Sequence, residues 1–349
     1  MTEPLISVFI RNRNEARVLG QAIDGLRRQR VSLPMEIVVL DNESTDESAD
    51  TAEERGARVF TLPRALFGYG RAINLGVELC RGRYVVLLSS HSIPQDEDWL
   101  AKLIAPMQAD PTTAAVFCNQ IPPAPRSRLE MRRFSVFPAG DRVLDQKRFV
   151  DLCARGTDPY EAALFSNSAC AFRREAALAH PFRDLMYAED RAFVVDLVMD
   201  GHSVAFVHDA VISYERGMTW RSGYTVGYRA QVSKRLIREL AATYTGVRHR
   251  STADTLSRLA RAAFVGPGLL VRLALSVAER PGLRRASARY SLRATGATLG
   301  MAKGVLRWRR HTETVSRDDV LQQRAREACT PWTSSAATGD TVVSGGTGG

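Results

Sequence analysis

The chain has few cysteines and no long hydrophobic run. Its five cysteines, among 349 residues, are scattered and form no CxxC pair. This spacing argues against a zinc site of cysteines and favours buried, reduced thiols in a cytosolic protein. No segment reaches the ~18 consecutive apolar residues that a membrane-spanning helix needs. No basic segment precedes the short apolar run at the N-terminus, so we expect no signal peptide and a cytoplasmic location.

Acidic residues are scarce in only one part of the chain. The net charge is +10, but residues 221–328 hold 22 Lys and Arg against 7 Asp and Glu. We expect a basic helical region at 229–328 and a disordered Ser-, Thr- and Gly-rich tail at 329–349. The basic region is either a helical cap with a solvated face or a contact with an anionic membrane surface. The second reading would make the protein peripheral on the inner membrane face. Nucleic acid is the less favoured partner.

Residues 1–228 alternate between apolar strands and amphipathic helices. This alternation predicts an α/β fold with a mostly parallel sheet flanked by helices. The expected strands are 5–10, 36–40, 59–62 and 84–88, and helices are expected between them and at 191–199. Right-handed crossovers place the carboxyl ends of parallel strands at one edge. Ligands bind at that edge in open α/β sheets.

The polar residues that follow these strands suit a nucleotide. Asp41 can accept from a ring N–H of a base, and Arg11 or Arg13 can hold phosphate oxygens. The structural alternative is that Ser44 or Thr45 caps the next helix. Both interpretations can hold together. The polar segments 11–15, 41–46 and 89–92 each follow a strand, and their meeting at one edge of the sheet favours a nucleotide site.

An ordered set of motifs in residues 5–228 resembles family 2 glycosyltransferases. They read ISVFIRNRNE, EIVVLDNESTDES, FGYGRAINLG, RGRYVVLLSSHSIPQDEDWL, FSNSACAFRREA and MYAEDRAFVVDLVMDGHSVAFVHDAVISY. The resemblance implies a GT-A fold and a nucleotide-sugar donor. It also implies a saccharide or lipid-linked saccharide as hydroxyl acceptor, and inversion at the anomeric carbon. Expected settings are hexosyl or deoxyhexosyl transfer and polysaccharide biosynthesis for the cell envelope.

The resemblance also implies roles for individual residues. Asp190 matches the general base that acts on the acceptor hydroxyl; alternatively, Glu189 and Asp190 only form the acidic first turn of a helix. The residues that would take part in catalysis are Asp190, Glu189 and His91. The residues that would bind the nucleotide sugar are Arg11, Asn14, Glu15, Asp41, Glu43, Ser44, Arg71, Asn74, Ser89 and Ser90.

Two departures from the family concern the metal. Where the family presents aspartate to Mg²⁺ or Mn²⁺, this chain has Ser89, Ser90 and His91, and no histidine follows the last strand at 213–216. Mg²⁺ prefers carboxylate and water oxygens, so the Mg²⁺ or Mn²⁺ that the resemblance implies as a cofactor would find few of its usual ligands in this motif. Charge on the leaving diphosphate would be stabilised either by such a metal or by His91 and arginines. His91 either neutralises phosphate directly, with Arg71 or Arg216, or is a turn histidine.

Two other functions compete with glycosyl transfer. One is a nucleotidyltransferase on a similar sheet, which would need a glycine-rich loop after the first strand; residues 11–15 contain no glycine. The other is a degenerate, non-catalytic binding protein, which the missing aspartate motif favours.

Overall fold

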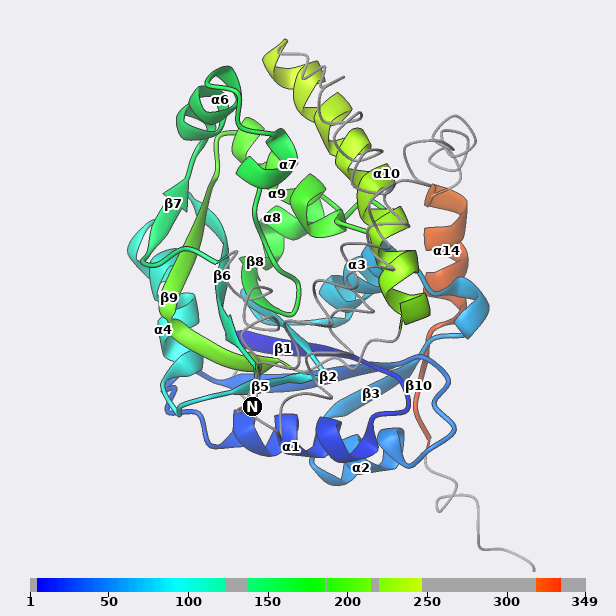
Figure 1. Cartoon of the computed structure of the whole chain (residues 1–349). Helices are drawn as coiled ribbons and strands as arrows, with labels where there is room; N and C mark the ends of the chain where they lie inside the picture. The colour runs from blue at the N-terminus through cyan, green and yellow to red at the C-terminus, as the bar shows by residue number, and fades with distance from the viewer. Residues whose placement is uncertain (1–4, 123–136, 186, 215–219, 247–317, 334–349) are drawn as a thin grey trace, which may run out of the picture.

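A sheet of ten strands runs through the computed structural model, which describes residues 5–122, 137–185, 187–214, 220–246 and 318–333 (Figure 1). The strand order is β10-β3-β2-β1-β4-β8-β6-β9-β5, and β7 pairs with β9. The strands are β1 (Ile6–Asn12), β2 (Met35–Asp41), β3 (Arg58–Thr61), β4 (Tyr84–Ser89), β5 (Ser92–Pro94), β6 (Thr113–Ile121), β7 (Arg142–Leu144), β8 (Ala169–Arg173), β9 (Ser203–Tyr214) and β10 (Thr330–Pro331).

The four strands expected from the sequence pair in parallel, in the order β3-β2-β1-β4. This confirms the predicted α/β class and the parallel centre of the sheet. The other half is mixed: β8 is antiparallel to both β4 and β6, whereas β6 and β9 are parallel. Because parallel strands need crossover connections, β1, β2, β3 and β4 all end at the same edge.

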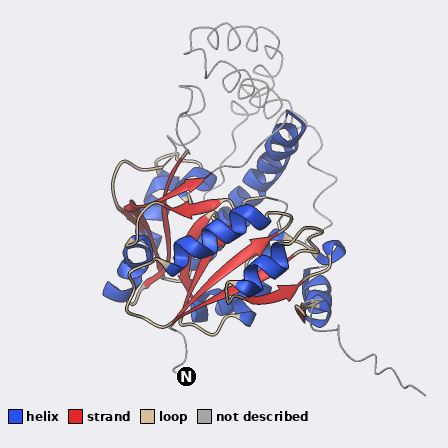
Figure 2. Ribbon diagram, turned by 90° about the horizontal axis from the view of Figure 1, so that it is seen from below, coloured by secondary structure: helices blue, strands red, loops and turns tan. Residues whose placement is uncertain are grey.

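Helices cover both faces of the sheet, and Figure 2 shows those of the near face lying across the strands. One face carries α1 (Ala16–Arg27), α2 (Ser48–Glu54) and α4 (Trp99–Ala109). The other carries α3 (Tyr69–Leu79), α6 (Gln146–Ala154), α7 (Pro159–Ala162), α8 (Arg174–Ala179), α9 (Glu189–Met199), α10 (Trp220–Thr245) and α14 (Asp318–Ala328). The short 3₁₀ helix η1 (Arg64–Leu66) precedes α3.

β1 has a continuous apolar run because helices cover both faces of the sheet at this strand. Val8 and Ile10 pack in the core under α1, while Phe9 points to the opposite core under α3. All three side chains are fully buried. A strand covered on both faces needs apolar residues at every position, because successive side chains point to opposite faces.

The C-terminal part is described only in pieces. Helix α10 runs across residue 228, where we predict a domain boundary, and that boundary stays a prediction. The basic segment 247–317 lies outside the described residues. We expected no structure from residue 329 onward, but Thr330 and Pro331 pair antiparallel with β3. In the part of the chain that the structure describes, no helix is long and apolar enough to cross a membrane.

Gly76 marks the closest approach between α3 and the sheet. A Cβ atom at Gly76 would lie 2.2 Å from Cζ of Phe9, a fully buried ring that has no room to move aside. We predict that Gly76→Ala lowers the free energy of unfolding by ~1–3 kcal/mol, measured by chemical denaturation. The free-energy cost of overpacking should exceed the gain of about 1 kcal/mol that comes from the higher helix propensity of alanine.

The matched control is Gly25→Ala in α1. A Cβ atom there would meet its nearest neighbours, in Arg28 and Pro94, at 3.9 Å, an ordinary contact. Gly25→Ala should therefore leave stability unchanged or raise it. Equal effects of the two substitutions would contradict the proposed close packing.

Candidate functional site

The ends of β1, β2 and β4 form one rim of polar side chains. In the register of the sheet, Asn12 lies opposite Asp41 and Arg11 lies opposite Ser89. The rim therefore brings together three of the segments that we expected to meet, although they are far apart in the sequence.

Asp41 is the centre of a buried hydrogen-bond network. Its side chain accepts from Asn12 Nδ2 at 3.0 Å, from the Ser44 hydroxyl at 2.6 Å and from the Ser44 N–H at 2.8 Å. The residue is 2% exposed. A carboxylate has about four acceptor positions, so three are occupied by protein donors. Asp41 thus holds the turn after β2, and its role in base recognition stays a prediction.

The turns after β1 and β2 are joined to each other. The Asn14 N–H donates to the Ser44 hydroxyl at 2.8 Å, and Asn14 Oδ1 accepts from the Thr45 N–H at 2.7 Å. Asn14 and Glu43 both have a left-handed backbone, with φ of 54° and 48°. The Glu43 carboxylate accepts from the Arg64 N–H at 2.8 Å, which connects this turn to η1. The nucleotide-binding candidates of these two turns are therefore held in one rigid unit.

His91 faces a carboxylate of the same rim. Its Nε2 lies 3.5 Å from Glu15 Oε1, and both side chains are partly exposed. The His91 N–H donates to the Ser89 hydroxyl at 3.4 Å, while Ser90 is buried. The end of β4 is where the family resemblance predicts a metal-binding aspartate. This chain has there the imidazole of His91, the hydroxyl groups of Ser89 and Ser90, and the nearby carboxylate of Glu15.

Two carboxyl groups open α9, that of Glu189 buried and that of Asp190 half-buried. The preceding residue, Ala188, is left-handed at φ 63°, and Glu189 accepts from Asn167 Nδ2 at 3.2 Å. Burial, reinforced by the neighbouring Asp190, raises the pKa of Glu189 to about 7. Burial also raises the pKa of Asp190, against the stabilising charge of Arg191. The two carboxyl groups interact, so their titrations are shared.

Arg11 supplies positive charge to this carboxylate pair. Its charge acts to lower the pKa of Glu189, in opposition to burial. The guanidinium also donates to the Tyr69 carbonyl at 3.4 Å and lies 5.6 Å from the centroid of the Tyr69 ring. Arg11 therefore contacts the start of α3 from the rim and places its positive charge where it acts on the start of α9.

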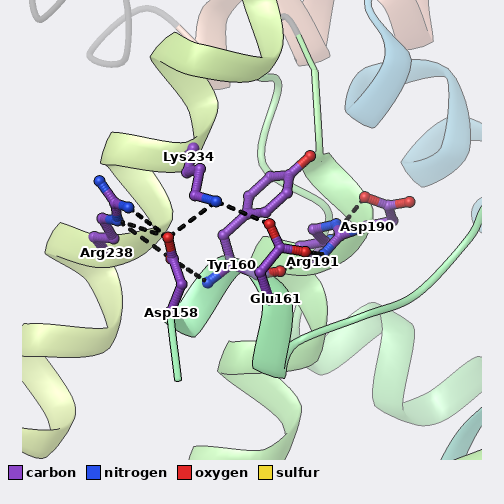
Figure 3. Close-up of polar contacts among 7 residues, drawn as sticks. All are labelled: Asp158, Tyr160, Glu161, Asp190, Arg191, Lys234 and Arg238. Carbon is purple, nitrogen blue, oxygen red and sulfur yellow. Dashed lines mark hydrogen bonds and ion pairs between the residues drawn. The ribbon is translucent and has the colours of Figure 1, made fainter. Parts of the chain in front are cut away.

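A cluster of charged residues supports the start of α9 from the other side (Figure 3). The ring of Tyr160 lies between Arg191, 4.0 Å from the ring centroid, and Lys234, 5.1 Å from it. Lys234 pairs with Asp158 at 3.0 Å, and Arg238 pairs with the same carboxylate. Because Arg191 follows Asp190 directly, this cluster fixes the backbone that carries Asp190.

Arg71 and Asn74 contact the segment that precedes α9. Arg71 is 6% exposed, donates to the Leu66 carbonyl at 2.6 Å and forms an ion pair with Asp184. Asn74 exchanges two hydrogen bonds with the backbone of Phe182, at 2.9 and 2.8 Å. Both side chains therefore clamp the segment before α9 onto α3, and their role at the donor phosphates stays a prediction.

Sequence reasoning missed three residues that shape this site. Asn12 bonds to Asp41, Asn167 bonds to Glu189, and Tyr160 supports Arg191. Asn12 was recognisable as the last residue of an apolar strand, and Asn167 lies within the motif FSNSACAF. Tyr160 gave no signal, because its contacts come from residues more than 30 positions away.

Comparison with known proteins identifies one family. The family model described as Glycosyl transferase family 2 matches residues 7–178. That match agrees with the predicted GT-A-type fold. No curated protein matches the chain.

Solved structures of low sequence identity also resemble the chain. One is glucosyl-3-phosphoglycerate synthase from Mycobacterium tuberculosis in complex with Mn²⁺, uridine diphosphate and glucosyl-3-phosphoglycerate. It is 20% identical, covers 70% of this chain and 81% of its own, and gives a TM-score of 0.48. Another is a mannosyltransferase from Pyrobaculum calidifontis in complex with GDP-Man and Mn²⁺. It is 18% identical over 94% of this chain and 81% of its own, with a TM-score of 0.45.

The raised pKa of Glu189 predicts a pH dependence of stability. The folded state binds the Glu189 proton more tightly than the unfolded chain, where the pKa is 4.5. This stabilising contribution is complete below pH 4.5 and is lost as the pH rises through about 7. Each unit of pKa corresponds to about 1.4 kcal/mol. We predict that in Glu189→Gln, which retains an acceptor oxygen for Asn167, the free energy of unfolding falls less between pH 4.5 and about 7 than it does in the wild type.

The measurement is the free energy of unfolding of wild type and variant across this pH range. Other groups also titrate, so the difference between the two proteins is the informative quantity. Glu53→Gln, at an exposed position of α2, is the control. A difference between wild type and Glu189→Gln that stays constant with pH would show that Glu189 does not titrate in this range.

Proposed function

We propose that this chain, whose residues 7–178 belong to glycosyl transferase family 2, transfers a sugar from a nucleoside-diphosphate donor to a hydroxyl acceptor. The observation that carries the proposal is the carboxyl pair Glu189-Asp190, fixed at the start of α9 and electrostatically coupled to Arg11 of the rim. A hexose or deoxyhexose is the expected sugar, and a saccharide or lipid-linked saccharide is the expected acceptor.

The donor would lie along the rim of the sheet. The base and ribose would contact the joined turns of Asn14, Asp41 and Ser44, which are already held by internal hydrogen bonds. Turns that are already ordered favour binding, because less conformational entropy is lost when the ligand binds. The diphosphate would then lie toward Arg11 and His91.

Asp190 would act as the general base. In the transfer step its carboxylate takes the proton of the acceptor hydroxyl while the hydroxyl oxygen forms a bond to the anomeric carbon. The bond from that carbon to the diphosphate oxygen breaks, its electron pair leaves with the nucleoside diphosphate, and the configuration inverts. Burial raises the pKa of Asp190, which strengthens it as a proton acceptor provided that it is ionised.

Positive charge must balance the leaving diphosphate. Among the described residues of the rim, Arg11 and His91 are suited to this role. Arg71 is committed to its ion pair with Asp184. Arg216 lies outside the described residues.

The groups around His91 fit a divalent metal poorly. Mg²⁺ is usually bound through carboxylates, substrate phosphates and water in octahedral geometry. Among the described residues, the carboxylate that pairs with His91 is that of Glu15, 3.5 Å away. The proposed transfer therefore uses protein groups alone, and turnover with and without added Mg²⁺ or Mn²⁺ tests this choice.

We extend the proposal to the location of the protein. The excess of Lys and Arg over residues 221–328 suits the anionic inner face of a membrane, where a lipid-linked acceptor would lie. Binding to anionic vesicles should then weaken as the salt concentration rises.

We predict that Asp190→Asn abolishes most transfer and preserves donor binding. Loss of a general base typically costs ~10²–10⁴ in rate. Binding should survive because Asp190 acts on the acceptor and the nucleotide lies along the rim. Turnover is measured with a panel of uridine-, thymidine- and guanosine-diphosphate sugars, and affinity for the corresponding nucleotides by calorimetry.

Asp50→Asn, on α2 at the opposite face of the sheet, is the matched control and should behave as wild type. Near-normal turnover by Asp190→Asn would refute the base assignment. No turnover by the wild type with any donor would favour the non-catalytic alternative. Release of sugar 1-phosphate in place of nucleoside diphosphate would indicate nucleotidyl transfer, because the bond between the two phosphates is then the one that breaks.

A further inference from the structure

A second group of polar side chains lies apart from the rim, where α8 and α9 end. In the described part of the chain, one set of three or more His, Cys, Asp or Glu side chains is arranged to hold a metal ion: His180, Asp200 and His202. Their potential ligand atoms all lie within 4.8 Å of one another. His180 Nε2 is 3.0 Å from Asp200 Oδ2, and the rings of the two histidines are edge to face at 5.9 Å.

The backbone that carries these side chains is fixed by hydrogen bonds. His180 caps α8, and its N–H donates to the Ala176 carbonyl at 2.9 Å. Asp200 caps α9, and the left-handed Gly201, at φ 86°, turns the chain so that His202 N–H reaches the Leu197 carbonyl at 3.1 Å. Two helices and one turn therefore bring the three side chains together.

The electrostatic setting favours a cation. The C-terminal ends of α8 and α9 meet here, and each carries partial negative charge from its unpaired carbonyl groups. The Asp200 carboxylate adds a full negative charge. Asp200 is also largely exposed, at 63% for its side chain, so an ion can reach the group from solvent.

We propose that His180, Asp200 and His202 bind one divalent transition-metal ion of the zinc class. Two imidazoles and one carboxylate suit Zn²⁺, Co²⁺ or Ni²⁺, whereas Mg²⁺ prefers oxygen ligands. Bonds of about 2.0–2.1 Å in a tetrahedral site place ligand atoms roughly 3.4 Å apart. The separation of 3.0 Å between His180 and Asp200 is close to that value. The ligand atom of His202 lies within 4.8 Å of the other two and would move closer to them on binding, and water would take the fourth position.

The site would stabilise the part of the fold that holds α3. From His180 the chain continues into the segment that exchanges hydrogen bonds with Asn74 and pairs Asp184 with Arg71. His180 and Asp200 also line a cavity of about 830 Å³ whose wall includes Asn74 and Asp184. A bound ion would thus join the ends of α8 and α9 next to this clamp, independently of the proposed transfer reaction.

A simpler arrangement would leave His180 and Asp200 as an ion pair with His202 only packed beside them. The two arrangements differ in what His202 does. In the metal site the His202 imidazole is a ligand, so its removal weakens metal binding. In the ion-pair arrangement His202 binds no metal, so its removal leaves any binding of Zn²⁺ to the protein unchanged. Substitution of His202 therefore distinguishes them.

The experiment measures binding of Zn²⁺ alone to the full chain, freed of metal with EDTA and dialysed. Calorimetry gives affinity and stoichiometry, and the visible absorption of bound Co²⁺ reports imidazole ligation. We expect one tight site per chain that excess Mg²⁺ does not occupy. His202→Ala and Asp200→Asn should each weaken it by more than ~100-fold. Residues that only orient a ligand already contribute ~10–100-fold.

His208→Ala is the matched control, because His208 lies on β9 with its Nδ1 3.2 Å from the Pro138 carbonyl and belongs to no such group. It should bind Zn²⁺ as the wild type does. His180→Ala serves as a third test where thermal unfolding shows that it folds. Wild-type Zn²⁺ affinity in His202→Ala and Asp200→Asn would overturn the proposal, and so would equal loss of affinity in His208→Ala.

Discussion

The parallel register of β1 with β2 and β4 is the constraint on which the candidate site depends. It places Asn12 beside Asp41 and Arg11 beside Ser89, so that residues from three separate loops share one rim. A one-residue slip of β1 would move the side chain of Arg11 and that of Asn12 each to the other face of the sheet. The slip would also break the Asn12–Asp41 hydrogen bond. Apolar side chains on both faces of β1 oppose such a slip only weakly. The hydrogen bonds among Asp41, Asn12 and Ser44 fix the register in addition to stabilising the turn.

The carboxyl pair at the start of α9 balances function against stability. Burying Glu189 raises its pKa, which means that its ionised form is disfavoured in the folded protein. Arg11, Asn167 and the helix N-terminus offset part of this cost. Groups held in this unfavourable state are frequent at active sites, because the same environment that destabilises a carboxylate makes it a better base. The cluster around Tyr160 gives the rigidity that such an arrangement requires.

The sequence was sufficient for the parallel half of the fold and for the location of the rim. Strands such as β1 and β4 are recognisable because both faces are buried, and the polar residues that follow them mark the edge. It was insufficient for β6 and β8, because an antiparallel pairing within a mixed sheet depends on contacts that no local pattern records. It also did not show which neighbour Arg71 and Asn74 would contact. A helical position indicates a direction from the helix axis, but the partner there, Phe182 or Asp184, is more than 100 residues away.

β10 and β5 are the two outermost strands in the order of the sheet. β10 is the shortest of the described strands, and β5 is as short as β7. β10 has two residues and β5 has three, and each ends in a proline, Pro331 or Pro94. Proline has no N–H to donate to a further strand, and so short a ladder offers few groups for pairing. The sheet is thus terminated at both ends against addition of a strand from another molecule. A truncation that ends the chain before residue 330 would remove β10 and expose the edge of β3, a four-residue strand without proline. Such a shortened protein would be prone to self-association even where its remaining core folds normally.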